Sequence, residues 1–195
     1  MKKHRVVLFA MIFVVTLSFS LMACDEKSDG NTVVLNQDMT AEDLANLIND
    51  CTSFTIVYKD ILIGRYTENG ISTMYEYFVA KSEEERSIIL KRIIFWESNR
   101  EYTIDIYYYA DNNEVSDSFI EIVEMTKEDF DNSYVSLRLM KQQAVTLCET
   151  YDWHIDNNQV VMEVEGLKTV LRDFNQTSLD IPEEYKNYKD LSLTE

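Results

Sequence analysis

Histidine and glycine are scarce in this chain of 195 residues, and their scarcity excludes several kinds of active site. The two histidines are His4, close to the N-terminus, and His154. His4 belongs to the basic N-terminal tip, so His154 is alone in the rest of the chain, and a lone histidine cannot build a zinc site of the common type without cysteine neighbours. The four glycines are dispersed along the chain, so the glycine-rich loops that cradle phosphates are absent. We therefore expect no metal site and no cofactor.

Sequence motifs of hydrolytic and redox enzymes are also missing. The chain has no Gly-x-Ser-x-Gly elbow, no His-Glu-x-x-His helix and no Cys-x-x-Cys pair. His154 lies in a stretch that is typical of a strand, where a surface or core histidine is a simpler interpretation than a catalytic base. Asp105 is the remaining candidate, as a mid-strand carboxylate in a hydrolase, and an exposed acid on a strand face is the alternative. We expect a protein that is not an enzyme.

Basic residues are few, with 18 lysines and arginines against 35 acidic residues. Residues 1–23 contain Lys2, Lys3 and Arg5 and no acid, so the formal net charge of −17 becomes −20 without them. Nucleic-acid binding depends on a basic stripe, and we therefore exclude it. The acids are spread along the chain, which is typical of a soluble surface kept free of aggregation.

An uncharged apolar run stands near the N-terminus. The chain begins MKKHR, and residues 6–23 then contain no charge. A basic tip followed by an apolar core is the layout of a signal peptide. An uncleaved membrane anchor is the alternative, because a spanning helix needs only about 20 apolar residues.

The apolar run ends at LMAC, in which Leu21, Ala23 and Cys24 resemble the lipobox of bacterial lipoproteins. Met22 departs from the small residue usual at its position. In that family the cysteine is acylated on sulfur and becomes the mature N-terminus. The resemblance covers residues 1–24 only. It implies a signal peptide at 1–23 and acyl chains such as palmitate on Cys24, which hold the protein to the cell membrane at its extracytoplasmic face.

The remainder divides into a polar tether and one domain. Residues 24–38 form the predicted tether, and residues 39–195 are enough for a single globular domain with its own core. Apart from Cys24, the chain has only Cys51 and Cys148. Outside the cytoplasm these two can form a disulfide, and two buried free thiols are the alternative.

The pattern of the domain predicts an α+β fold. Thr40 and Asp43 have the spacing of a capping box and predict a helix over 41–51, and Thr126 marks a second helix start that continues through 130–150. Short polar turns separate the segments between them, so their strands pair antiparallel as a meander. We expect a curved or half-barrel sheet of about five to eight strands, packed by the two helices, with a frayed tail around Pro182. The predicted strands are 54–68, 71–80, 87–96, 102–110, 115–123, 153–155, 159–165 and 167–174. Asn157-Asn158 is the predicted hairpin turn between 153–155 and 159–165.

Two features of the strands suggest a binding face. Residues 87–96 are apolar on both sides, so a helix, a partner or a ligand is expected to cover the second side. Aromatic side chains are also concentrated in the meander and form a predicted ligand or partner face, although tyrosines also serve simply to cover a sheet. The residues of this predicted face are Tyr75, Tyr77, Trp96, Tyr107 and Tyr109.

The order of elements resembles the half-barrel of the lipoprotein-carrier family, whose members bind acyl chains between a curved sheet and its helices. No residue motif carries this resemblance, so no binding residue follows from it. It implies a non-catalytic protein that binds a hydrophobic or acyl-bearing ligand. A protein-interaction module of the cell envelope is the alternative, and a carboxylate-dependent hydrolase is a third.

Replacing Cys24 with serine tests the lipid anchor. We expect the Cys24→Ser variant to leave the membrane fraction and to incorporate no labelled palmitate, because the acyl chains attach through the sulfur. The measurement is radiolabelling of growing cultures followed by fractionation. Absence of label in the natural chain, with unchanged fractionation of the variant, would show that the anchor is wrongly assigned.

Overall fold

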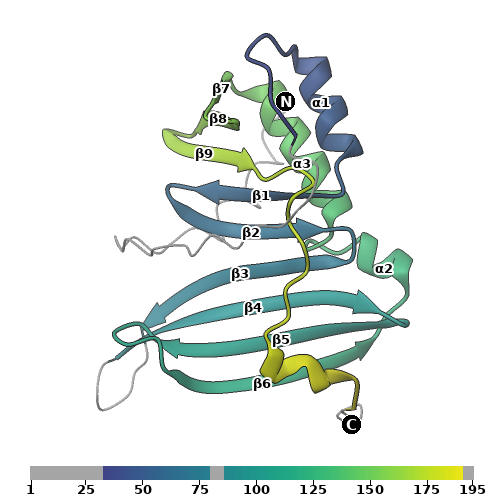
Figure 1. The fold of residues 1–195 in the computed structure, drawn as a ribbon, viewed down its shortest axis with the longest axis vertical. Coiled ribbons are helices and arrows are strands. Elements are labelled where there is room, and N and C mark those ends of the chain that lie inside the picture. Colours follow the sequence, from purple (N-terminus) through teal and green to yellow (C-terminus); the bar gives the residue numbers. More distant parts are fainter. Residues whose placement is uncertain (1–32, 80–85, 191–195) are drawn as a thin grey trace, which may run out of the picture.

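The computed structural model describes residues 33–79 and 86–190, and the fold is α+β, as predicted (Figure 1). The described strands form one open, curved antiparallel sheet in the order β6-β5-β4-β3-β2-β1-β9-β8-β7. The strands are β1 (Ser53–Tyr58), β2 (Ile61–Thr67), β3 (Gly70–Val79), β4 (Ser87–Glu97), β5 (Arg100–Tyr109), β6 (Val115–Glu124), β7 (Trp153–Asp156), β8 (Gln159–Val164) and β9 (Leu167–Arg172). The helices are α1 (Ala41–Asp50), α2 (Lys127–Asp131), α3 (Leu137–Thr150) and the 3₁₀ helix η1 (Glu183–Asp190).

Helix α1 begins as the sequence predicts. The backbone N–H of Asp43 donates to Thr40 Oγ1 at 3.2 Å, and the backbone N–H of Thr40 donates to Asp43 Oδ2 at 2.9 Å. The two bonds form the capping box. The Thr40 hydroxyl also donates to Asp43 Oδ2 at 2.7 Å, and the bonds from the Thr40 N–H and hydroxyl lower the pKa of the Asp43 carboxyl below its usual value. The start of α1 is therefore fixed by local sequence alone.

The second predicted helix is interrupted, so its prediction as one helix through 130–150 is wrong. Helix α2 ends at Asp131, and α3 starts anew after Ser136. The Ser136 hydroxyl donates to the Asp131 carbonyl at 2.7 Å, and its oxygen accepts from the N–H of Leu139 at 3.3 Å. The break also buries Val135 in the core. One serine thus links the two helices and caps the second.

A turn that the sequence analysis missed divides residues 54–68 into β1 and β2. Lys59 and Asp60 connect the strands with φ of 48° and 63°. Two successive residues with positive φ form the tight hairpin turn that usually carries Asn-Gly. Lys-Asp lacks that signal, and the β-rich stretch therefore looked continuous. The predicted hairpin turn at Asn157-Asn158, with φ of 48° and 60°, is confirmed.

The ends of the chain contribute more to the body than predicted. Leu35 is buried in the core and its N–H donates to Asn158 Oδ1 at 2.7 Å, while Asn158 Nδ2 donates to the Val33 carbonyl at 2.9 Å. The domain therefore includes Val33 to Asp38, which the sequence analysis placed in the tether. These bonds join the N-terminal segment to the distant β7–β8 hairpin.

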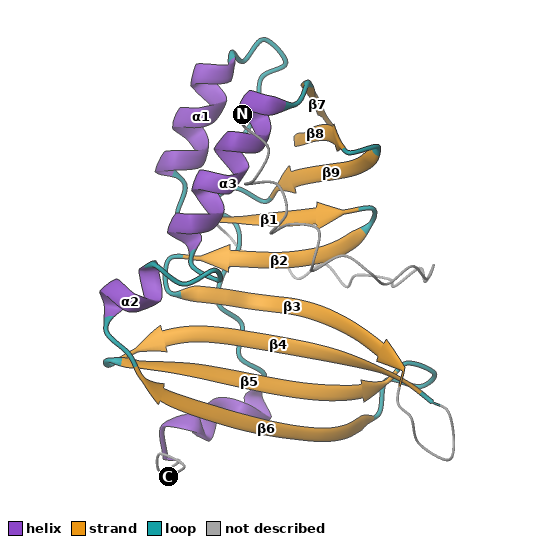
Figure 2. Ribbon diagram, turned by 180° about the vertical axis from the view of Figure 1, so that it is seen from behind, coloured by secondary structure: helices purple, strands orange, loops and turns teal. Residues whose placement is uncertain are grey.

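Helices α1 and α3 pack together and cover one side of the sheet over β1, β2, β9 and β8 (Figure 2). Their apolar side chains and those of the strands form the larger of two cores. The buried helix and strand residues of this core include Leu44, Ile48, Leu137, Met140, Ala144, Cys148, Phe54, Ile56, Tyr66, Ile71, Ile94, Val160, Met162 and Leu171. The helices thus cover only about half of the sheet.

Residues 175–190, here called the C-terminal strap, cross the opposite side of the sheet (Figure 1). The N–H of Thr177 donates to Ser53 Oγ at 3.0 Å, which fixes the strap on β1. The strap then reaches β4–β6 and forms a second core there. The prediction of a frayed tail is therefore wrong for the described residues, because the apolar members of the strap pack on the sheet. The second core contains Ile93, Phe95, Tyr102, Ile104, Ile106, Ile122 and Tyr188, with Leu179, Ile181 and Tyr185 beside them.

Tyr188 attaches the end of the strap. Its ring meets Phe95 and Tyr102 edge-on, with 4.9 Å between centroids in both pairs, and its hydroxyl donates to Glu97 Oε2 at 3.0 Å. Removing the ring leaves a cavity between two aromatic side chains. We expect Tyr188→Ala to lower the free energy of unfolding by about 3 kcal/mol, and Tyr188→Phe by about 1 kcal/mol.

Urea denaturation of the chain lacking residues 1–24 measures both changes. Tyr134→Ala is the matched control, because Tyr134 is exposed and lies outside both cores. Equal stabilities of Tyr188→Ala and Tyr134→Ala would show that the strap does not hold the sheet.

Candidate functional site

The five predicted face residues do not share one side of the sheet. Tyr75 pairs with Lys91, whereas Tyr107 pairs with Leu90. Leu90 and Lys91 are neighbours on β4 and therefore point to opposite sides of the sheet. Lys91 shares its side with Ile93, which packs beneath the strap, so Tyr75 lies on the strap side and Tyr107 on the helix side. Tyr109 shares the side of Tyr107. Tyr77 pairs with Ile89 along the backbone, and its side chain lies outside the described part.

Trp96 belongs to the packing around α2. Its indole N–H donates to the Met125 carbonyl at 3.0 Å, and Lys127 Nζ lies 5.6 Å from the ring centroid. The ring also contacts the larger core. Because backbone, cation and core hold the indole, its contacts are structural.

An uncovered surface remains on the helix side of β4, β5 and β6, which we call the open face. Figure 2 shows the sheet from this side, and neither α1 nor α3 extends over these strands. Phe119 and Val123 of β6 are 48% and 41% exposed. Phe119 stacks on Tyr107 with 5.9 Å between ring centroids. The open face has the side chains of Leu90, Arg92, Glu101, Thr103, Asp105, Tyr107, Tyr109, Asp117, Phe119, Glu121 and Val123.

An ion pair lies in the middle of the open face. Arg92 Nε and one of its terminal nitrogens each donate to one oxygen of Asp105 at 2.7 Å. The Asp105 side chain is 1% exposed and that of Arg92 is 26% exposed. The interpretation of Asp105 as an exposed strand-face acid is therefore wrong. The bidentate contact occupies both carboxylate oxygens, which leaves Asp105 poorly placed for catalysis.

Acidic side chains accompany the apolar ones on this surface. Burial raises the pKa of the Glu101 carboxyl above its usual value, and the nearby Glu121 carboxylate raises it further. Asp117 and Glu121 are exposed on either side of Phe119. The open face thus combines exposed apolar side chains along its β6 edge with acidic side chains beside them.

Tyr109, at the C-terminal end of β5, has the Arg86 guanidinium over its ring. The Arg86 guanidinium lies 3.5 Å from the centroid of Tyr109, and Arg86 Nε donates to Asp111 Oδ2 at 3.0 Å. Tyr109 is therefore partly covered by the protein itself, and Tyr107 is the predicted face residue that remains in the open face beside Phe119.

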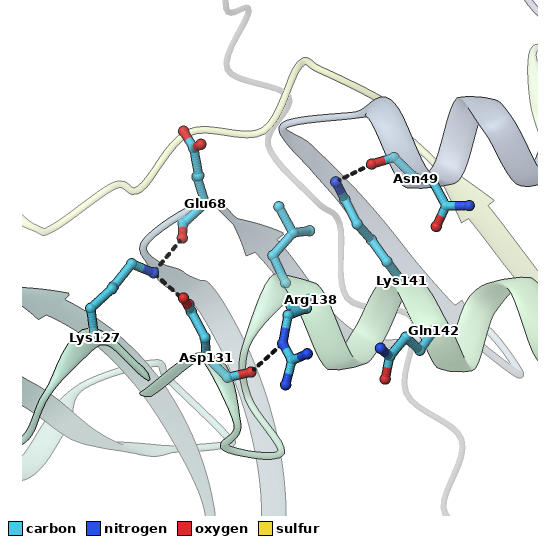
Figure 3. A pocket seen from close by; sticks show the side chains of 8 residues that line it. Asn49, Glu68, Lys127, Asp131, Arg138, Lys141 and Gln142 are labelled. Atoms are coloured by element: carbon cyan, nitrogen blue, oxygen red, sulfur yellow. Dashed lines mark hydrogen bonds and ion pairs between the residues drawn. The ribbon is translucent and has the colours of Figure 1, made fainter. Parts of the chain in front are cut away.

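A separate pocket lies between α2, α3, the end of α1 and the β2–β3 turn (Figure 3). Its volume is about 400 Å³, and all but one of the residues that line it are polar or charged. Lys127 Nζ donates to Asp131 Oδ1 at 2.5 Å, and Lys141 Nζ donates to the Asn49 carbonyl at 2.7 Å. The lining residues are Asn49, Glu68, Lys127, Asp131, Leu137, Arg138, Lys141 and Gln142. No local sequence pattern marks this pocket, because its residues are far apart along the chain.

Cys51 and Cys148 are free, buried thiols in the larger core, which is the second of the two predicted alternatives. Lys141 of α3 reaches Asn49 near the end of α1, and Cys148 lies seven residues further along α3, about 10 Å at 1.5 Å per residue. A disulfide needs Cα atoms within about 7 Å. Burial raises the thiol pKa of Cys51 to about 11 and that of Cys148 to about 12, so both stay protonated.

Strand β4 no longer requires a ligand to explain its two apolar sides. Ile94 contributes to the core beneath the helices, while Ile93 and Phe95 contribute to the core beneath the strap. The hypothesis of an acyl-bearing ligand therefore stays a prediction, and the packing of β4 gives it no further support.

Other predicted kinds of site can be placed against the described residues. His154 is exposed on β7. In residues 33–79 and 86–190, no three His, Cys, Asp or Glu side chains gather as a metal site requires. Each helix within these ranges is too short or too polar to cross a bilayer. Cys24 lies outside the described residues.

Comparison of the chain with known protein families, curated proteins and solved structures finds no match. The resemblance to lipoproteins and to the carrier half-barrel therefore stays a prediction, and the site must be interpreted from its own geometry.

The Arg92–Asp105 pair predicts an asymmetric response to mutation. Arg92→Met leaves a buried carboxylate without its partner, and we expect it to lower the free energy of unfolding by about 3 kcal/mol. Asp105→Asn leaves Arg92 without its carboxylate partner, but water can reach the partly exposed Arg92. We therefore expect Asp105→Asn to lower the free energy of unfolding by only about 1 kcal/mol. Urea denaturation measures both, with Lys168→Met as a control at an exposed lysine. Equal losses for the two variants would contradict this account.

Proposed function

We propose that this protein is a lipid-anchored interaction module of the cell envelope, which binds a partner protein through the open face. The observation that carries the proposal is the partial exposure of Phe119 and Val123 on β6, the edge strand of an uncovered sheet surface. Large apolar side chains grouped on an uncovered surface are typical of interaction sites.

The charges on the open face indicate the chemistry of the partner. Glu101, Asp117 and Glu121 lie beside the apolar side chains, and the partial burial of Glu101 near Glu121 makes its negative charge costly. A lysine or arginine from a partner would relieve this repulsion and steer association. The expected partner therefore presents apolar side chains bordered by basic ones.

A second copy of this chain fits this surface poorly. Two open faces brought together would oppose their acids, and like charges in contact oppose association. The net charge of the whole chain, −17, adds to the repulsion. These features favour a different, basic protein.

The anchor and the open face act together in this proposal. Acyl chains on Cys24 restrict the domain to the membrane surface, which raises its local concentration relative to other envelope proteins. The buried Arg92–Asp105 pair keeps β4 and β5 in register beneath the binding surface, and this is a positioning role.

Site-specific photocrosslinking in intact cells tests the proposal. A photoreactive residue at Phe119 is expected to crosslink a recurrent basic protein, and Glu121→Lys is expected to reduce that product about tenfold, because it replaces an attraction with a repulsion. The matched control carries the photoreactive residue at Tyr134, which is exposed elsewhere on the molecule.

The outcome that counts against the open face is the same set of products from both positions, or no product from Phe119. Native mass spectrometry of the same preparation distinguishes the partner-protein hypothesis from the acyl-ligand hypothesis. A bound lipid mass supports the acyl ligand, and a crosslinked protein supports the partner.

A further inference from the structure

We propose that the pocket between α2 and α3 binds a small organic anion that has two or more carboxylate or phosphate groups. This site is separate from the open face and does not depend on the proposed partner. Its volume of about 400 Å³ is within the usual range for small-molecule sites.

Two cations of the pocket are held in place without being neutralised. Arg138 Nε donates to the Asp131 carbonyl at 3.2 Å, and a terminal nitrogen of Arg138 donates to Asn132 Oδ1. Lys141 Nζ donates to the Asn49 carbonyl at 2.7 Å. Every one of these acceptors is an uncharged amide oxygen, so each bond orients a cation and leaves its charge available.

The acids of the pocket do not cancel these charges. Asp131 forms its ion pair with Lys127 at 2.5 Å. Figure 3 shows the carboxylate of Glu68 directed away from Lys127, and it is the backbone carbonyl of Glu68 that accepts from Lys127 Nζ at 3.3 Å. Among the described residues, neither Arg138 nor Lys141 forms an ion pair. The pocket is therefore locally positive on a chain of net charge −17.

The wider negative charge of the protein acts weakly at this distance. Physiological salt screens exposed charges beyond about 8 Å, so groups within the pocket dominate the local potential. The polar amides of Asn49 and Gln142 add hydrogen-bonding groups to the lining, and Leu137 adds an apolar contact for a carbon skeleton.

The arrangement favours a ligand with more than one anionic group. Arg138 and Lys141 are one turn apart on α3, and their charged ends point in different directions, toward Asp131 and toward Asn49 (Figure 3). A single small ion can contact one of them, whereas a molecule with separated anionic groups can contact both. The planar guanidinium suits carboxylate and phosphate oxygens equally, so geometry leaves both chemistries within the same class.

NMR titration of the chain lacking residues 1–24 with small anions tests the site, with binding measured from the changes in backbone amide chemical shifts. Citrate, with three carboxylates, and fructose 1,6-bisphosphate, with two phosphates, are the two probes, which distinguish carboxylate from phosphate. Acetate, with one carboxylate, is the control for screening at equal ionic strength. We expect a saturable shift of the residue 138–142 amides with at least one probe. The Arg138→Gln/Lys141→Gln double variant is expected to weaken that binding about tenfold or more.

The matched control is Lys168→Gln/Lys186→Gln, which removes two exposed cations elsewhere and is expected to bind like the natural chain. Thermal unfolding without ligand shows whether each variant is folded. If the pocket double variant unfolds early, the single Arg138→Gln variant replaces it. Shifts that match acetate for both probes, or equal affinity in the natural chain and the pocket variant, would overturn the proposal.

Discussion

The antiparallel pairing of β1 with β9 is the contact on which the rest of the structure depends. It joins the first strand of the N-terminal meander to the last strand of the closing hairpin, with Ile56 opposite Leu171. Without this pairing the sheet would end at β1, and α3 would lack the surface on which β8 and β9 contribute Val160 and Leu171 to the core. The pairing also delivers the chain to Ser53, where the C-terminal strap is fixed.

A sheet built in this way has two apolar sides that are covered by different means. The helices cover the β1, β2, β9 and β8 half from one side, and the strap covers the β4–β6 half from the other (Figures 1 and 2). The helix side of β4–β6 is the part of the sheet that neither the helices nor the strap cover. Its uncovered state follows from the lengths and placement of α1 and α3, and it is this part that presents Phe119 and Val123 outward.

Charge is distributed unequally between the two candidate surfaces. On the open face, Arg92 is paired with Asp105, so Glu101, Asp117 and Glu121 leave the surface negative. In the pocket, Asp131 forms its ion pair with Lys127, so the positive charges of Arg138 and Lys141 are not neutralised by it. Each ion pair thus sets the sign of its surroundings, which is how one acidic chain presents surfaces of opposite character.

The sequence by itself determined features that depend on neighbouring residues. The capping box of Thr40 and Asp43, the turn at Asn157-Asn158 and the alternation of the strands are local, and they predicted the α+β class and most strands correctly. The turn at Lys59-Asp60 and the break at Ser136 escaped because their residues are weak signals on their own. Only the tertiary structure decided the rest. Strand register placed Tyr75 and Tyr107 on opposite sides, burial beside Arg92 turned Asp105 into a structural group, and packing brought Asn49, Lys127 and Lys141 to one pocket. These contacts join residues distant in the chain, so their geometry arises only when the chain has folded.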